Sequence, residues 1–386
     1  MHIPAPLPDE HSKGYQGRVR RLNGDIPLVT LRKHLVNSLN AREENSAKYN
    51  IVEALALASQ VGLERFVRNH TLMPFLRIVH SDSAASAHGT ASSYRQLTQA
   101  GLVVADHCAK FCLDCVNEDR LAIGFAYWRR SHQLPGIVFC SKHQSILYEV
   151  HRDAPALALP SEFENAQPIG EDVALAAKQN TVIHRYVHVC NAFLKSEAPI
   201  HSVSAAMRIA KQASKCSPLS QHPEAGGGSL DDLAISMLGG PWLAKFFPSV
   251  IDHKRKKAIR INSVTQKSSS SHSAAYALAL SMCWDSPEVA YAEFSRPTNV
   301  AERAAIVSCG SLSGQQPEPL GISKKSGDRH IFRNLKHALN CIAAGSSIAE
   351  AGTKFKICSM KLEKILNKAD LSDALVTQKF IAAQIC

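Results

Sequence analysis

Long hydrophobic runs are absent from this 386-residue sequence. The most apolar stretch, residues 274–284, is too short to cross a bilayer and is interrupted by Ser281. Residues 1–10 contain three prolines and no apolar centre, so we expect no secretory leader. These absences predict a soluble cytoplasmic protein with no membrane partner. Hydrophobic residues make up 45% and charged residues 20%, which is typical of a globular chain long enough for two to three domains.

Motifs of several enzyme classes are also missing. The sequence has no glycine-rich Walker A loop and no recognisable nuclease or nucleophile constellation. A zinc-dependent nucleic-acid deaminase needs a His-x-Glu element before a Pro-Cys-x-x-Cys element, but Phe111 precedes Cys112 and no His-x-Glu lies upstream. The sequence therefore favours a binding protein over an enzyme.

Strand-like alternation is scarce, and the short stretch 136–140 is its main example. Apolar residues recur at spacings of three and four over residues 51–67, 173–193, 202–214 and 273–284, which predicts helices and a mainly α fold. Loop-like compositions occur at residues 81–93, 217–229, 268–273 and 310–321. We therefore expect a helical multidomain protein with an N-terminal domain (1–150), a helical middle region (151–320) and a C-terminal region (321–386).

Eleven cysteines are present, an odd number, and most lie far apart, which argues against a secreted disulfide framework. Four soft ligands are the exception: Cys112 and Cys115 form C-x2-C, and Cys140 and His143 form C-x2-H after 24 intervening residues. Two tight turns of this kind complete a tetrahedron suited to one structural Zn²⁺ with no open position. A redox pair is the weaker alternative. The neighbouring His107 and Cys108 could replace a ligand, although a packing or supporting role fits them better.

A segment between the two ligand pairs contains Trp128, Arg129 and Arg130. An aromatic residue followed by two arginines could clamp a phosphate or an acidic partner, so we predict partner binding here. Two alternatives stay open: Trp128 covers the zinc turn while the arginines are solvated, or the arginines are structural. His132 is more typical of a hydrogen-bonded structural histidine.

Positive charge is concentrated in two places. The net charge is +11, and residues 254–268 contribute +6 without any acid. Residues 321–368 hold ten Lys or Arg against three acids, so the remaining chain is close to neutral. Such clustering is what a polyanion-binding surface requires. The first cluster, Lys254, Arg255, Lys256, Lys257 and Arg260, is predicted to contact DNA phosphates, with a solvated loop as the alternative.

The C-terminal cluster falls on a predicted helix-turn-helix of three short helices over residues 335–369. Ser347 and Glu350 have the spacing of a capping box at the start of the middle helix. The following helix would expose Ser359, Met360, Lys361, Lys364 and Lys368 on the element that enters a major groove in such folds. A plain helical hairpin in a bundle is the alternative.

The amino-acid sequence of the ligand segment resembles that of the TniQ family of bacterial transposon proteins, which includes the TnsD-type target selectors. The shared pattern consists of Cys112, Cys115, Glu118-Asp119, residues 127–136, Cys140, Lys142 and His143, and residues 6–24 resemble the family's N-terminal signature. The resemblance implies a TniQ-like N-terminal domain whose zinc-ribbon-like module spans residues 108–147. Two departures are notable: residues 147–183 lack a second cysteine cluster, and no proline follows Cys112.

The resemblance also implies a non-catalytic adaptor. Such a protein marks an insertion site by binding double-stranded DNA or by docking on a CRISPR RNA-guided complex, and recruits an AAA+ ATPase that signals to the transposase. The alternative function is a zinc-containing helix-turn-helix transcription regulator that recruits nothing. The sequence leaves a homodimer as an open alternative to a monomer.

Overall fold

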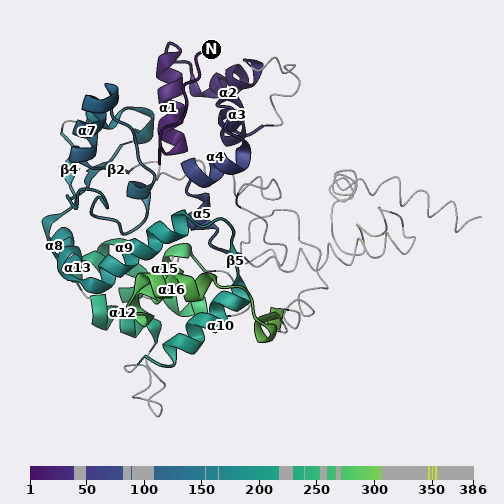
Figure 1. The fold of residues 1–386 in the computed structure, drawn as a ribbon, viewed down its shortest axis with the longest axis vertical. Helices are drawn as coiled ribbons and strands as arrows, with labels where there is room; N and C mark the ends of the chain where they lie inside the picture. The colour runs from purple at the N-terminus through teal and green to yellow at the C-terminus, as the bar shows by residue number, and fades with distance from the viewer. Residues whose placement is uncertain are drawn as a thin grey trace, which may run out of the picture. The chain divides into compact units, whose positions relative to one another are not determined.

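A computed structural model describes most of the first 306 residues and a few positions beyond them (Figure 1). The described residues are 1–38, 49–80, 88, 108–152, 154–163, 165–216, 229–238, 240–252, 259–266, 271–303, 305–306, 347, 350 and 353. The chain divides into two compact units, Met1–Ser313 and Gly314–Cys386. The described part is mainly helical, which confirms the predicted fold class. The finer division at residues 150 and 320 stays a prediction.

The first helices form a small core of their own. They are α1 (Ser12–Leu22), α2 (Leu28–Asn37), α3 (Ile51–Ala58), α4 (Leu63–His70) and α5 (Met73–Leu76). A capping box starts α3, because Asn50 Oδ1 accepts from the Glu53 amide and the Glu53 carboxylate accepts from the Asn50 amide. The apolar pattern over 51–67 therefore belongs to two helices, separated by a turn in which Gly62 has a φ of 80°.

A three-stranded antiparallel sheet follows. Strand β2 (Ala109–Phe111) pairs with β3 (Tyr148–Val150), and β3 pairs with β4 (Gln167–Pro168). Helix α7 (Leu113–Ile123) begins directly after β2, and the 3-10 turns η3 (Ser131–Gln133), η4 (Pro155–Leu157) and η5 (Pro160–Glu162) shape the loops. The predicted alternation at 136–140 yields one isolated bridge, Phe139 to Ile146, rather than a strand. A separate two-stranded parallel sheet joins β1 (Val79–His80) to β5 (Ile200–His201).

The largest core lies among the later helices. They are α8 (Glu171–Gln179), α9 (Thr181–Leu194), α10 (Ser202–Ala213), α12 (Leu230–Leu238), α13 (Gly240–Phe246), α14 (Pro248–Ile251), η6 (Ile261–Thr265), α15 (Ser273–Cys283) and α16 (Pro287–Ser295). The predicted helical stretch 173–193 is divided at Asn180, whose side chain caps α9 by accepting from the amides of Val182 and Ile183.

Helix α15 carries the most apolar run of the sequence and is buried along its whole length. It packs against α9, α10, α12, α16 and η6 (Figure 1), so the run serves as the centre of a helical core. Within the described residues, no helix combines the length and apolar character that crossing a membrane requires.

The loop before the second ligand pair rests on the helical core. Trp242 Nε1 donates to the Gly136 carbonyl at 3.0 Å, and Tyr186 Oη donates to the Pro135 carbonyl at 2.9 Å. Gly136 has a φ of 74°, and a Cβ there would lie 2.8 Å from the Trp242 ring. One hydrophobic cluster accordingly includes Cys112 and Cys140 together with residues as distant as Phe294.

A candidate metal centre and the predicted binding residues

Two turns present the four predicted ligands. Cys112 is the N-cap of α7 and Cys115 lies in the first turn of that helix. The second turn is closed by backbone hydrogen bonds from Gln144 to Cys140 and from Cys140 to Ser145, both 2.9 Å long. The three cysteines are buried and His143 is partly buried. The structure therefore brings together the residues that the sequence pairs.

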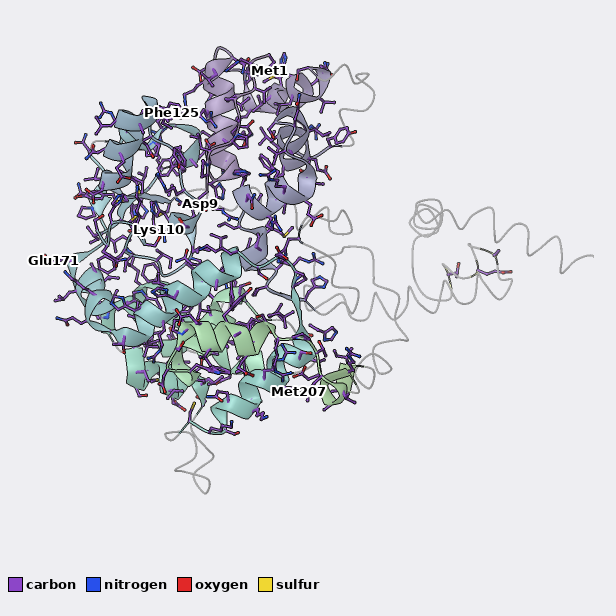
Figure 2. The ribbon with its side chains drawn as sticks, viewed as in Figure 1. Met1, Asp9, Lys110, Phe125, Glu171 and Met207 are labelled. Carbon is purple, nitrogen blue, oxygen red and sulfur yellow. The ribbon has the colours of Figure 1, made fainter. Side chains whose placement is uncertain are left out.

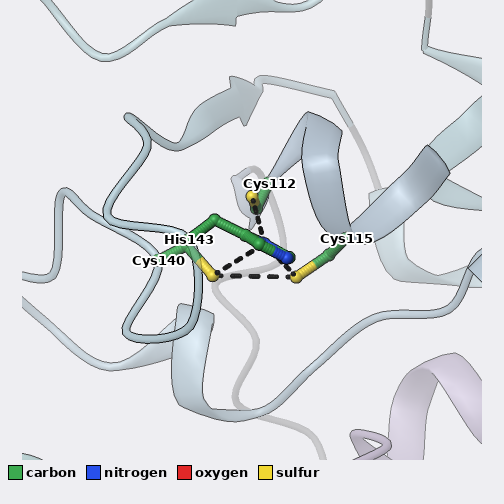
Figure 3. A group of neighbouring side chains, drawn as sticks. All are labelled: Cys112, Cys115, Cys140 and His143. Atoms are coloured by element: carbon green, nitrogen blue, oxygen red, sulfur yellow. Dashed lines mark hydrogen bonds between the residues drawn. The ribbon is translucent and has the colours of Figure 1, made fainter. Parts of the chain in front are cut away.

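The distances fit a metal ion (Figure 3). His143 Nδ1 lies 3.5 Å from Cys112 Sγ, 3.4 Å from Cys115 Sγ and 3.7 Å from Cys140 Sγ. Cys115 Sγ and Cys140 Sγ are 3.6 Å apart, and all four ligand atoms lie within 4.8 Å of one another. Tetrahedral zinc bonds of about 2.3 Å to sulfur and about 2.0 Å to nitrogen place ligand atoms roughly 3.5–3.8 Å apart. The cluster is compatible with zinc.

Glu118 orients the histidine ligand. Its carboxylate accepts from His143 Nε2 at 2.9 Å and also binds the Lys142 ammonium. A proton on Nε2 leaves Nδ1 free to bind a metal, which is the usual arrangement of a carboxylate behind a ligating histidine. The hydrogen bond with Glu118 raises the pKa of His143. Glu118 lies one helical turn after Cys115, and that spacing of three is the sequence signal that could have identified its role.

Cys108 does not join this cluster. It lies with Glu149 and His151, and Glu149 binds the Lys245 ammonium at 2.7 Å. Burial raises the pKa of the Cys108 thiol, as for a packed cysteine. His107 lies outside the described residues.

Trp128 is almost completely buried. Its indole Nε1 donates to the Ala158 carbonyl at 2.7 Å, and its ring meets Phe111 edge-on with centroids 5.9 Å apart. A Cβ at Gly14 would lie 3.1 Å from the Trp128 side chain, a tighter contact than most, so the glycine suits the close approach of the indole. Trp128 is thus positioned as a core residue of the sheet module.

Arg129 is committed to an internal ion pair. Its Nη1 and Nη2 donate to the two carboxylate oxygens of Asp119, each at 2.7 Å, and its guanidinium lies 4.4 Å from the Tyr127 ring centroid. This bidentate geometry is the strongest form of an arginine–carboxylate bond. It connects the loop after α7 to the helix that carries Cys115.

Arg130 joins the first helices to the metal module. Its Nε donates to Asp9 Oδ1 at 2.8 Å, and its Nη1 donates to the Thr71 carbonyl at 3.1 Å and to the Arg68 carbonyl. Asp9 also accepts from the Ser131 hydroxyl at 2.6 Å (Figure 2 labels Asp9). Both arginines are therefore held inside the protein rather than projecting from the loop, which favours the structural alternative. Their role in partner binding stays a prediction.

Buried histidines surround this junction. Burial lowers the pKa of His132 to about 4, of His70 to about 4 and of His11 to about 3. Each ring is therefore neutral near pH 7. The expectation of a structural rather than ligand-binding His132 agrees with its 3% exposure.

Lys110 has a structural role that no pattern in the sequence indicates. Its buried ammonium donates to the carbonyls of Leu134 and Ile137 at 2.7 and 3.0 Å (Figure 2 labels Lys110). Burial lowers its pKa to about 8. The lysine thereby holds the loop that leads to Cys140.

Most of the predicted DNA-binding residues lie outside the described residues. They are Lys254, Arg255, Lys256, Lys257, Ser359, Met360, Lys361, Lys364 and Lys368. Arg260 is described and exposed, directly before η6. The capping box predicted for the C-terminal region is present: the Ser347 amide donates to Glu350 at 2.9 Å and the Glu350 amide donates to Ser347 Oγ at 3.2 Å. The helix-turn-helix itself stays a prediction.

Comparison with known proteins gives one family. Residues 2–147 match the TniQ family model, and this segment contains all four metal-ligand candidates. No curated protein matches the chain. The resemblance stated from the ligand segment is confirmed for these residues, which form about two fifths of the chain.

Proposed function

We propose that this chain, which belongs to the TniQ family through residues 2–147, is a non-catalytic adaptor that selects target sites for transposition. The family match carries this proposal, since it ends four residues after His143 and so includes the complete metal module. The family is associated with transposition. The adaptor's own task would be to bind DNA or an RNA-guided complex and to recruit an AAA+ ATPase, inside a bacterial cell.

One zinc ion would be held by Cys112, Cys115, Cys140 and His143. Four protein ligands leave no position for substrate or water, so the ion's contribution is structural. It would join α7 to the turn at residues 140–143, which Glu118 of α7 also contacts through Lys142 and His143. Because ligand binding and local folding occur together in such modules, zinc would stabilise the surface that a partner meets.

Duplex DNA is the second proposed partner. The concentration of positive charge in residues 254–268 and 321–368 supports this proposal. The capping-box hydrogen bonds between Ser347 and Glu350 support the predicted start of the middle helix in the helix-turn-helix. A transcription regulator would share this property, so DNA binding alone does not separate the two functions.

Recruitment of an ATPase does separate them. The test is co-purification of the tagged full-length chain with an AAA+ transposition ATPase, with and without duplex DNA. Retention of the ATPase supports the adaptor. DNA binding with no retained ATPase and no effect on transposition would instead support the transcription regulator. A CRISPR RNA-guided complex, added as a third component, tests the RNA-guided route to the same recruitment.

A further inference from the structure

A cavity of about 650 Å³ opens where β5, α10 and α16 meet, far from the metal module in sequence. Its polar lining is mostly cationic or hydroxyl-bearing: Arg208, Arg296, Arg303, Ser196, Ser295 and Thr298. Glu197 is the one carboxylate that lines it among the described residues. That carboxylate already pairs with Arg68 at 3.2 Å.

Two of the arginines share a single buried carboxylate. Arg208 Nε and Nη2 donate to the two oxygens of Glu302 at 3.0 and 2.7 Å, and Arg208 Nη1 donates to the Phe294 carbonyl at 2.6 Å. Arg296 Nη2 donates to the same Glu302 at 2.7 Å. The side chains of Arg208 and Glu302 are each 3% exposed, so this pair is fixed in a region of low polarity.

Positive charge therefore exceeds negative charge along this wall. The second partner of Arg296 is Glu293, which is 59% exposed and lies 3.5 Å away, so solvent weakens its compensation. Arg303 is exposed at the cavity edge, and its guanidinium has no ion-pair partner among the described residues. The single negative charge of Glu302 does not neutralise both Arg208 and Arg296. Positive charge and some N–H groups of the two guanidiniums therefore stay available to an anion in the cavity.

We propose that this cavity binds a phosphate group, with Arg303 and Arg296 as the contacting residues and Arg208 as the fixed charge behind them. Arginine forks match the oxygens of a phosphate in two-point contacts, and the volume accommodates a phosphate ester. Backbone phosphates of nucleic acid and free phosphate esters present the same chemistry. If the bound phosphate belongs to nucleic acid, the proposal rests on the proposed function and adds a DNA contact outside the basic segments 254–268 and 321–368. If it belongs to a free phosphate ester, the proposal is independent of that function.

Inorganic phosphate is the first probe. The full-length protein in its metal-bound form is heated in phosphate and in chloride buffers of equal ionic strength, and the shift in Tm gives the phosphate affinity. We expect phosphate to stabilise the unaltered chain, and Arg303→Ala to weaken the affinity by about tenfold, the usual effect of losing a hydrogen bond to a charged group. Arg303→Lys should keep part of the effect because the charge remains.

Arg32→Ala is the matched control, since Arg32 is an exposed arginine on α2 and its removal changes the net charge equally. Binding of duplex DNA at several salt concentrations then distinguishes nucleic acid from a free phosphate ester. If the dependence of log affinity on log salt concentration (the salt slope) falls by about one in Arg303→Ala and is unchanged in Arg32→Ala, the cavity binds a backbone phosphate. A phosphate effect without a change in slope assigns it to a free phosphate ester. If Arg303→Ala and Arg32→Ala respond alike to phosphate, the proposal is overturned, whatever the outcome of ATPase recruitment.

Discussion

Glu118 and His143 are joined by a hydrogen bond of 2.9 Å between a carboxylate oxygen and Nε2, while Nδ1 of the same ring lies 3.4–3.7 Å from three thiols. This relationship assigns the two ring nitrogens to different tasks. One nitrogen anchors the ring to α7, and the other completes a four-ligand cluster. The Glu118 carboxylate thereby favours the tautomer with a proton on Nε2, the form that can bind a metal through Nδ1.

The first prediction is one zinc per chain, measured by elemental analysis of the purified protein. Cys112→Ser and Cys140→Ser should each lose the zinc and unfold the module around it, because the binding free energy is also folding free energy there. Cys216→Ser is the matched control, since this partly buried thiol lies outside the cluster. A chain without metal, equally stable before and after these substitutions, would contradict the prediction.

The second prediction concerns Glu118→Gln. The amide oxygen can still accept from His143 Nε2, but the negative charge that strengthens the ligand is lost, so zinc affinity should fall by about 10- to 100-fold. Competition with a chromophoric chelator measures this change. Glu171→Gln, at an exposed position on α8, is the control. Equal affinities in the two variants would mean that Glu118 does not support the ligand.

The metal cluster could be predicted from the sequence because its ligands occur as two local pairs, each fixed by one turn. The contact of Asp9 with Arg130 spans 121 positions, and no local pattern indicates it. The role of Lys110 could not be predicted either, because nothing about a lysine in a short strand indicates that its ammonium will donate to two loop carbonyls. The fold class followed from helical periodicity, whereas the break at Asn180 depends on a cap within a continuous apolar pattern.

The third prediction tests the helix-turn-helix. Lys361→Ala and Lys364→Ala should each weaken duplex binding and lower the salt slope by about one if each contacts a phosphate. A variant that also relaxes sequence preference would identify a base-reading residue. Titrations at several salt concentrations give both quantities. Unchanged binding in the double variant would assign the DNA contact elsewhere, first to Lys254–Arg260.

The fourth prediction is a loss of stability in mild acid. Burial lowers the pKa of His11 to about 3 and of His70 to about 4, below the ordinary 6.5. The unfolded chain therefore binds more protons between these values, so the free energy of unfolding is highest above pH 6.5 and falls as the pH drops towards 4. His11→Asn preserves an acceptor at the N-cap of α1 but cannot titrate.

Denaturant unfolding at pH 7 and pH 5 tests this assignment. The loss between the two values should be smaller in His11→Asn than in the unaltered chain, by on the order of 1–2 kcal/mol. Both proteins contain the same metal ligands, so acid release of zinc contributes equally and cancels in the comparison. An equal loss in both would exclude His11 as a source of the pH dependence.

The last prediction separates the two interpretations of the arginines. Arg130 contacts Asp9, the Thr71 carbonyl and the Arg68 carbonyl from a side chain that is 9% exposed. Removing it leaves these acceptors partly buried without their donor, so Arg130→Ala should lower the free energy of unfolding by about 2–4 kcal/mol. Arg129→Ala should cost less, because among the described residues the Arg129 guanidinium donates hydrogen bonds to Asp119 alone and its side chain is 16% exposed. Thermal unfolding of the zinc-bound chain measures both.

Arg65→Ala, an exposed arginine on α4, is the control for the loss of one charge. The same three variants are then assayed for ATPase retention. If Arg130→Ala keeps the stability of the control yet loses the ATPase, the residue serves the partner and the structural interpretation is wrong. If stability and recruitment fall together, the Asp9–Arg130 contact acts by holding the first helices against the metal module. Partner recognition would then belong to other residues of that assembled surface.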